Sequence, residues 1–145
     1  MLTKVQSRRG GFTLVEIMIV VAIIALLASI AVPSFLRARK RSQATSTLET
    51  CRMVDGAKDQ YAIENGKSPG VTPSAADLVV YIKTGTKLYN DLNVNSKAID
   101  NLGNDIAING IDVPPKVDAA TRAALDDVLG GVSSAAADTF WGSYK

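Results

Sequence analysis

The sequence predicts an α+β protein built from one long amino-terminal helix and a small carboxy-terminal domain with a short β-hairpin. Three features indicate this class: an almost uncharged run over residues 12–35, one apolar stripe over residues 44–61, and short, varied elements after residue 66. A run that is apolar on every face and a stripe with helical spacing are both surfaces of helices. We therefore expect one helix of roughly 50 residues, with errors of a few residues at each end.

Residues 12–35 form the apolar half of this helix. The 24 residues from Phe12 to Phe35 contain Glu16 as their only charge. At about 1.5 Å per residue the helix would be about 36 Å long, which exceeds the roughly 30 Å of a bilayer core. This predicts a membrane-spanning helix, and a buried helix of a soluble protein is the weaker alternative. Because Pro33 cannot donate to the Ser29 carbonyl, we expect a kink near residues 29–33.

The charges are distributed unevenly. The chain has 16 Lys and Arg and 14 Asp and Glu, and seven of these cations flank the apolar run, in residues 1–11 and 37–41. From Ser42 onward nine Lys and Arg accompany thirteen Asp and Glu, a net charge of −4. Such flanks are typical of membrane proteins, whereas nucleic-acid binding favours a basic face interleaved with aromatics. We expect residues 37–41 to be solvated or to face lipid head groups; contact with DNA or an acidic partner is the weaker alternative.

The composition excludes several kinds of active site. The chain has no His, which removes His-based triads and His metal sites. Its single Cys, Cys51, excludes an intrachain disulfide, and its place on the apolar stripe predicts a buried thiol rather than a bridge between subunits. We find no phosphate-binding loop and no nucleophile paired with a base, so we expect neither enzyme activity nor a cofactor.

The amphipathic half of the helix continues to residue 65. Its apolar residues recur at spacings of three and four, which places them on one helix face. Asn65-Gly66, with Pro69 close behind, predicts the end of the helix. The stripe is expected to pack against the domain that follows, and it consists of Ala44, Leu48, Cys51, Val54, Ala57 and Tyr61.

Two short helices are predicted in the carboxy-terminal domain. Ser74-Ala75-Ala76-Asp77 has the pattern of a capping box, and Gly85 is expected to end the helix that it starts. A second helix is expected over about residues 118–129, before Gly130-Gly131. The tail contains Phe140, Trp141 and Tyr144, which either form a final strand or dock on the domain.

The segment between these helices predicts turns and a hairpin. Asn and Asp are dense over residues 90–105, which indicates loops. Residues 91–95 begin like an EF-hand loop, but Ser96 replaces its Gly and Leu102 its bidentate Glu, which favours Asx turns over a calcium site. Residues 105–108 and 111–113 alternate about Asn109-Gly110, the favoured dipeptide of a type I′ turn, and predict a β-hairpin that Pro114-Pro115 ends.

Glu16 needs an explanation within the apolar run. A charge in the hydrocarbon region costs about 2.5 to 3.5 kcal/mol at the centre and less toward an end, so it requires a partner or a function. The nearest cation before it is Arg9, outside the run. A cut between Gly11 and Phe12 would create an α-amino cation four residues before Glu16, one helical turn away. Residues 1–31 also resemble a secretory signal peptide with a cleavage site at Ala31, which is the weaker interpretation.

The same residues carry a family resemblance. Arg9-Gly10-Gly11-Phe12-Thr13-Leu14-Val15-Glu16, followed by an apolar stretch ending in Val32-Pro33, resembles the class III signal of type IV prepilins and type II secretion pseudopilins. The resemblance implies that a prepilin peptidase cuts after Gly11 and N-methylates Phe12. It implies that Glu16 pairs with the terminal amine of a neighbouring subunit, that Thr13 holds the usual polar position, and that Pro33 matches a frequent proline.

The resemblance also implies an organisation and a location. Residues 1–11 would be the cleaved leader, 12–35 the transmembrane or filament-core helix, 36–65 its amphipathic continuation and 66–145 a small α+β head of type IV pilin-like fold. The implied partners are further copies in a helical filament, the prepilin peptidase, an assembly platform protein and a cytoplasmic ATPase. The protein would be a single-pass protein of the bacterial inner membrane and then part of a periplasmic or extracellular filament.

The sequence leaves open the kind of filament subunit, its biological role and two other classes of protein. The motif does not separate a major pilin from a minor pilin or a secretion pseudopilin, nor does it choose among adhesion, motility, DNA uptake and secretion. A secreted soluble domain would begin after cleavage near Ala31. A single-span membrane protein that never polymerises would keep residues 1–11.

Overall fold

The chain folds around one long helix. The computed structural model describes residues 11–131 and 134–145, so the expected leader lies outside the described residues except for Gly11. Helix α1 covers Leu14–Asn65 and takes part in both compact units of the chain, residues 1–36 and 37–145. The predicted α+β class, with a long amino-terminal helix and a small carboxy-terminal region, is confirmed.

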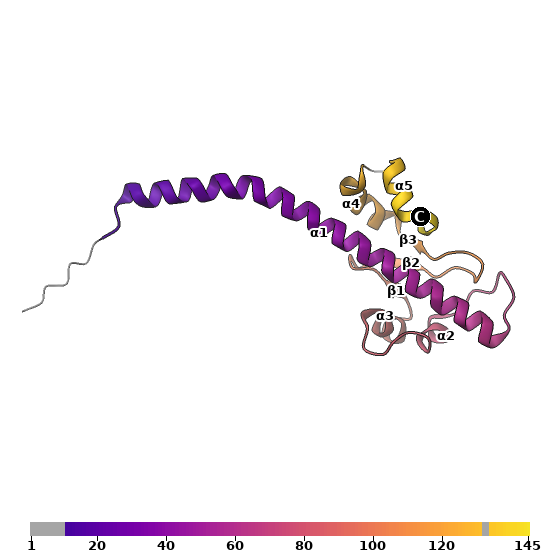
Figure 1. Ribbon diagram of the computed structural model, residues 1–145. Helices are drawn as coiled ribbons and strands as arrows, with labels where there is room; N and C mark the ends of the chain where they lie inside the picture. The colour runs from indigo at the N-terminus through magenta and orange to yellow at the C-terminus, as the bar shows by residue number, and fades with distance from the viewer. Residues whose placement is uncertain (1–10, 132–133) are drawn as a thin grey trace, which may run out of the picture. The chain divides into compact units, whose positions relative to one another are not determined.

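The amphipathic half of α1 is packed as its spacing predicts. Five of the six stripe residues are buried and Tyr61 is half-buried, which confirms the apolar face. The helix ends at Asn65, and Gly66 follows with a φ of 56°, a left-handed conformation that glycine adopts without steric penalty. In Figure 1, α4 and α5 lie on one side of this half of α1, and α2 and α3 lie on the other.

A small antiparallel sheet completes the second unit. Its strands are β1, Ala98–Ile99, β2, Asp105–Ala107, and β3, Lys116–Val117, in the order β1-β2-β3. The register places Ala98, Ile106 and Val117 side by side, and all three are buried. Because side chains alternate along a strand, this row faces the core while its neighbours along the strands lie outside the buried row.

The predicted hairpin about Asn109-Gly110 is wrong. Strand β2 pairs instead with β1 and with β3, which lies beyond Pro114-Pro115, and residues 111–113 are not a strand. Asn109 has a positive φ of 57°, but Gly110 does not, so the two φ values required for a type I′ turn are not met.

Longer-range hydrogen bonds explain the difference. The Ile111 N–H donates to the Val71 carbonyl at 2.9 Å, and the Gly70 N–H donates to the Asp112 carboxylate at 2.8 Å. The Val113 carbonyl accepts from the Lys58 ammonium at 2.6 Å. These partners occupy backbone and side-chain groups of residues 111–113 and hold the segment as a loop, which we call the β2–β3 loop, residues 108–115.

The first short helix forms where predicted but is shorter. Helix α2 covers Ala75–Val79, and its capping box is complete: Ser74 accepts from the Asp77 N–H and the Asp77 carboxylate accepts from the Ser74 N–H. The helix does not extend to Gly85, which lies in a turn before α3, Lys87–Asn90, a helix capped by Thr86. Residues 91–95, predicted as Asx turns, form a π-helical segment.

The last two helices bring the tail onto the domain. Helix α4 covers Ala119–Leu129 with Asp118 as its N-cap, close to the predicted bounds. The tail forms α5, Ala135–Trp141, and a 3₁₀ turn over Gly142–Tyr144, so the docking alternative is confirmed and the strand alternative is wrong. Trp141 is buried, and its indole N–H donates to the Asp126 carboxylate at 2.7 Å.

The core of the second unit therefore gathers side chains from every element around α1. The largest buried apolar residues contributed by these elements are Leu78, Leu88, Leu92, Ile106, Leu125 and Trp141. Beside them lies a buried polar group, Asp100, whose carboxylate accepts from the Leu102 and Asn104 N–H groups and from the Thr121 hydroxyl. Because all of these donors are paired with the carboxylate, the buried charge is compensated.

Candidate assembly surface of the amino-terminal helix

Thr13 caps the amino-terminal end of α1. Its hydroxyl oxygen accepts a hydrogen bond from the Glu16 N–H at 3.2 Å, and its carbonyl accepts from the Ile17 N–H at 3.3 Å. The first donors of a helix have no partner within it, so a Thr in this position satisfies one of them and fixes where the helix starts. The cap places Glu16 in the first turn, where a carboxylate interacts favourably with the helix dipole.

This capping role was missed in the sequence. Thr13-Leu14-Val15-Glu16 has the same pattern as the capping box that we recognised at Ser74. Only half of the box forms at Thr13, because no group in residues 11–131 or 134–145 donates a hydrogen bond to the Glu16 carboxylate. Glu16 is also exposed. Its carboxylate is therefore available to a donor from outside the chain.

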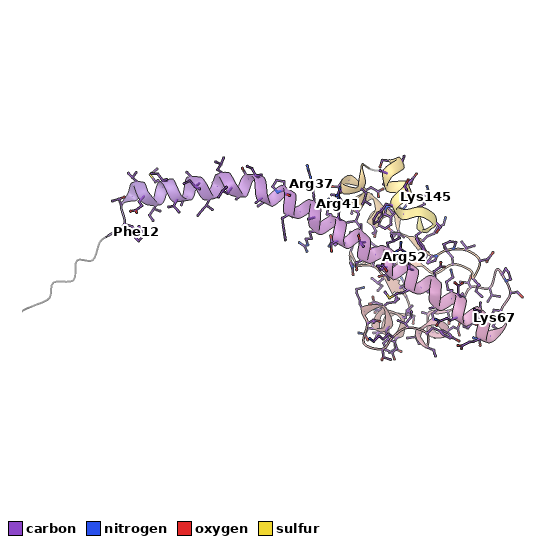
Figure 2. The ribbon with its side chains drawn as sticks, in the orientation of Figure 1. Phe12, Arg37, Arg41, Arg52, Lys67 and Lys145 are labelled. Atoms are coloured by element: carbon purple, nitrogen blue, oxygen red, sulfur yellow. The ribbon has the colours of Figure 1, made fainter. Side chains whose placement is uncertain are left out.

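The expected cleavage site precedes the helix. Gly11, Phe12 and Thr13 have no regular secondary structure, and all three are exposed. The Phe12 ring is 80% exposed, and Figure 2 shows it at the start of α1. The bond between Gly11 and Phe12 thus lies outside the hydrogen-bonded helix.

The first unit presents an apolar surface on which no described part of the chain packs. Every residue from Leu14 to Leu36 is exposed, and α1 contains a stretch long and apolar enough to cross a membrane, none of it buried within the chain. Single exposed apolar residues are ordinary, but a continuous surface of this kind marks an interaction site. The largest exposed side chains on it include Leu14, Ile17, Met18, Ile19, Leu26, Leu27, Ile30 and Phe35. Pro33 lies within the helical span, and the kink near it stays a prediction.

The basic cluster at residues 37–41 is divided between two roles. Lys40 forms an ion pair with Asp127 at 2.7 Å, and the Arg41 guanidinium donates to the Val128 carbonyl at 3.2 Å, near the carboxy-terminal end of α4. Cations are favoured at that end of a helix. The prediction of a solvated cluster holds for Arg37 and Arg39, which are exposed, and is incomplete for Lys40 and Arg41. Figure 2 labels Arg37 and Arg41.

Cys51 belongs to the core rather than to a reactive site. It is a free, fully buried thiol on the stripe of α1, as predicted. Burial, and to a smaller extent the nearby carboxylates of Asp100 and Asp55, together raise its pKa from 9.0 to about 12. Since the thiolate is the reactive form, this environment suppresses oxidation and alkylation.

The Asp91 carboxylate, considered above for a calcium loop, has a protein partner. It accepts from the Lys87 ammonium at 2.6 Å, and the same ammonium donates to the Ile99 and Asp100 carbonyls. Within the part of the chain that the structure describes, no group of three or more His, Cys, Asp or Glu side chains is arranged to hold a metal ion.

Comparison with known proteins gives one family match and several relatives. Residues 6–32 match the family described as the prokaryotic N-terminal methylation motif. The chain is 49% identical over 57 residues to the type IV wide pilus major component PilA4 of Thermus thermophilus, covering 38% of this chain and 42% of that protein. It is 34% identical over 64 residues to the type II secretion system core protein G of Klebsiella pneumoniae, covering 44% and 46%.

A third relative agrees with these two. The type IV major fimbrial protein FimA of Dichelobacter nodosus is 40% identical over 77 residues, covering 52% of this chain and 46% of FimA. The matched region spans about half the length of these relatives or less. No solved structure matches the chain. Residues 6–32 thus carry the N-terminal methylation motif, and the homologues of the chain include type IV pilins and type II secretion core proteins G.

Proposed function

We propose that the chain is a subunit of a type IV pilus-like filament, assembled through its amino-terminal helix. The observation that supports this most directly is the exposed apolar surface of α1 from Leu14 to Leu36, preceded by the capped start at Thr13. Apolar surface of this extent is stable only when lipid or other helices cover it. The bilayer would cover it before assembly, and the helices of neighbouring subunits would cover it in the filament.

Processing would create the positively charged partner that Glu16 lacks. A prepilin peptidase would cut between Gly11 and Phe12, outside the helix, and methylate the new amine of Phe12. Since the Glu16 carboxylate accepts no hydrogen bond within the described residues, it is available to the amine of a neighbouring subunit. A charge pair in an apolar environment is worth more than in water, so it would set the axial register of the subunits. Thr13 would fix the helix start that places both groups.

The remaining parts of the proposal follow the family. The unprocessed protein would span the bacterial inner membrane once, with residues 1–11 as leader, 12–35 as the spanning helix, 36–65 as its continuation and 66–145 as the head. An assembly platform protein and a cytoplasmic ATPase would drive its transfer into a periplasmic or extracellular filament. The choice between pilin and secretion pseudopilin depends on partners encoded elsewhere.

The first experiment is the intact mass and amino-terminal sequence of the protein from its native membrane. We expect N-methylated Phe12. A terminus at Val32 would instead indicate a secreted domain, and an uncut Met1 would indicate a membrane anchor that does not enter the filament pathway. Either result would contradict the proposal.

The second experiment separates processing from assembly. We expect Glu16→Ala to leave cleavage and the membrane pool unchanged while filaments recovered from the cell surface or the periplasm fall at least about tenfold, because the charge pair is lost. Glu49→Ala, which removes an exposed carboxylate paired with Arg52 on the same helix, is the matched control. Normal filaments from the Glu16 variant would refute the proposed role of the carboxylate.

A further inference from the structure

The exposed face of α1 in the second unit carries charged groups that have no oppositely charged partner among the described residues. Four of the ionic groups on residues 40–58 are used locally: Arg52 pairs with Glu49 at 2.8 Å, and Lys58 with Asp55 at 3.3 Å. Lys40 and Arg41 are bound by α4, as described above. The charged side chains just beyond the two ends of this stretch are therefore the ones available to another molecule.

Two cations remain at one end. Arg37, which is labelled in Figure 2, and Arg39 are both exposed. Neither forms an ion pair or a side-chain hydrogen bond anywhere in the described residues. Two carboxylates remain at the other end. Asp59 is exposed and likewise unpaired within the described part of the chain, and Glu64 is exposed and accepts only from the neutral Tyr81 hydroxyl at 2.9 Å.

The spacing of these four groups matches the helix period. Asp59 follows Arg37 by 22 residues and Glu64 follows Arg39 by 25. At 3.6 residues per turn these separations are about six and about seven whole turns, so each acid lies on nearly the same side of the helix as its cation. The axial separation is about 33 to 38 Å. Arg37 and Arg39 are about 200° apart around the helix and so lie at opposite edges of its exposed face. A parallel copy packed beside this face and displaced along the axis by about this distance would therefore bring opposite charges together at both edges of the contact.

The middle of the same face has room for a close approach. Gly56 lies there in the helix interior, where glycine is less favourable than every residue except proline, and a Cβ at this position would meet nothing within 4 Å. Nothing within the described chain therefore requires a glycine. Met53 and Ile63 flank it and are 42% and 82% exposed. A position without a side chain between two exposed apolar side chains suits packing against another element.

We infer that this face of α1 is a head-to-tail contact between copies of this chain, in which Arg37 and Arg39 of one copy meet Asp59 and Glu64 of another. The inference rests on the proposed filament function and adds a polar contact outside the apolar helix surface. A contact between two different patches on identical chains repeats without closing, which produces a filament when the copies are related by a screw displacement. The surface thus specifies the axial offset of the copies.

The test uses charge reversal in the full-length protein expressed in its native cells. One variant carries Arg37→Glu and Arg39→Glu, a second carries Asp59→Lys and Glu64→Lys, and a third carries all four changes. Lys83→Glu is the control, since Lys83 is an exposed lysine outside α1. Filaments released by shearing, or from the periplasm, are quantified by immunoblot against the membrane pool of each variant, so that differences in folding or insertion are removed.

We expect each double variant to yield at least about tenfold less filament than the wild type, because two attractions become repulsions. The fourfold variant restores opposite charges at every contact, and its yield should return to within about twofold of the wild type. The control should match the wild type. Double variants that assemble normally would overturn the inference, and so would a fourfold variant as poor as the double ones, which would indicate lipid head groups or another partner.

A second pair of measurements concerns Gly56. We expect Gly56→Ala to raise the thermal midpoint of the purified protein, because alanine favours the helix, and Gly56→Leu to lower filament yield by obstructing the contact. A wild-type filament yield from Gly56→Leu would contradict the close approach of a second copy at Gly56. Failure of the wild type itself to form filaments would refute the proposed function, whereas normal wild-type filaments with unaffected charge-reversed variants would refute only this inference.

Discussion

Residues 14–36 and residues 37–65 belong to the same helix but differ in which side chains they expose. The first stretch exposes every side chain that it carries, most of them apolar, whereas the second buries one stripe and exposes polar groups elsewhere. Both stretches are rich in residues compatible with a helix, so local preference does not distinguish them. The difference lies in what covers them. The second stretch is covered by its own chain, whereas no described part of the chain covers the first.

The largest expected effect concerns Cys51, which lies in the covered stretch. Burial should make its thiol far less reactive than an exposed one. Its pKa of about 12 predicts a thiolate population at pH 8 about a thousandfold below that of a thiol of pKa 9.0, in addition to steric protection. We therefore expect almost no alkylation of the native protein and rapid alkylation in urea. A cysteine introduced at exposed Thr45, in a Cys51→Ala background, is the control and should react at once. Equal rates at the two positions would contradict the burial of Cys51.

The same shift predicts a dependence of stability on alkaline pH. Because the folded-state pKa lies above the unfolded value, the unfolded chain loses its proton first, and stability falls as the pH rises from about 9 toward 12. Below about pH 9 the contribution is complete. The fall attributable to Cys51 is the part that disappears in Cys51→Ala, measured by urea unfolding at several pH values.

The next effect compares one substitution in the two stretches. Leu48 is 8% exposed and Leu27 is 61% exposed on the same helix. We expect Leu48→Ala to lower the free energy of unfolding of the second unit by about 3 kcal/mol, because it leaves a cavity. Leu27→Ala should change it by less than about 0.5 kcal/mol. Fluorescence of Trp141, the single Trp, reports unfolding of the full chain in detergent. Similar losses of unfolding free energy for both variants would show that Leu27 is as buried as Leu48 and would contradict the difference between the two stretches.

The smallest effect concerns the surface pair between Lys40 and Asp127. Both side chains are about half exposed, at 41% and 51%, so water and salt screen their attraction. We expect Lys40→Ala to lower the free energy of unfolding by less than about 1 kcal/mol, with the loss vanishing in high salt. Arg37→Ala removes a cation without a described partner and should have no effect. A loss above about 2 kcal/mol that persists in salt would contradict this account.

Sequence reasoning succeeded wherever a local pattern decides the outcome. The stripe of α1, the capping box at Ser74, the helix over about residues 118–129 and the stop at Asn65-Gly66 each depend on residues close together in the chain. The start of α1 at Thr13 belongs to the same class and was overlooked, although the pattern Thr-x-x-Glu was visible. The roles expected for Gly11, Phe12 and Glu16 depend on a peptidase and on other copies, which a single chain does not contain.

Sequence reasoning failed where partners distant in the chain decide. Asn109-Gly110 favours a tight hairpin locally, but Val71 and Lys58 bind the residues that would have formed its second strand. Residues 91–95 looked like turns because they are rich in Asn and Asp, yet they form a π-helical segment whose Leu92 is buried in the core. The tail could be a strand or a docked helix until Trp141 and Asp126 were seen to meet. None of these contacts leaves a short-range signal.

The buried ammonium of Lys58 has a consequence for how this protein can diversify. It is fully buried on α1, and the β2–β3 loop supplies its nearest acceptor, the Val113 carbonyl, with Asp55 as the second partner. A lineage that shortened or redirected this loop would leave a buried positive charge with one long contact, which is strongly unfavourable. We therefore expect Lys58 and the loop to evolve together: descendants that keep the lysine should keep the loop length, and those that change the loop should replace the lysine with an apolar residue.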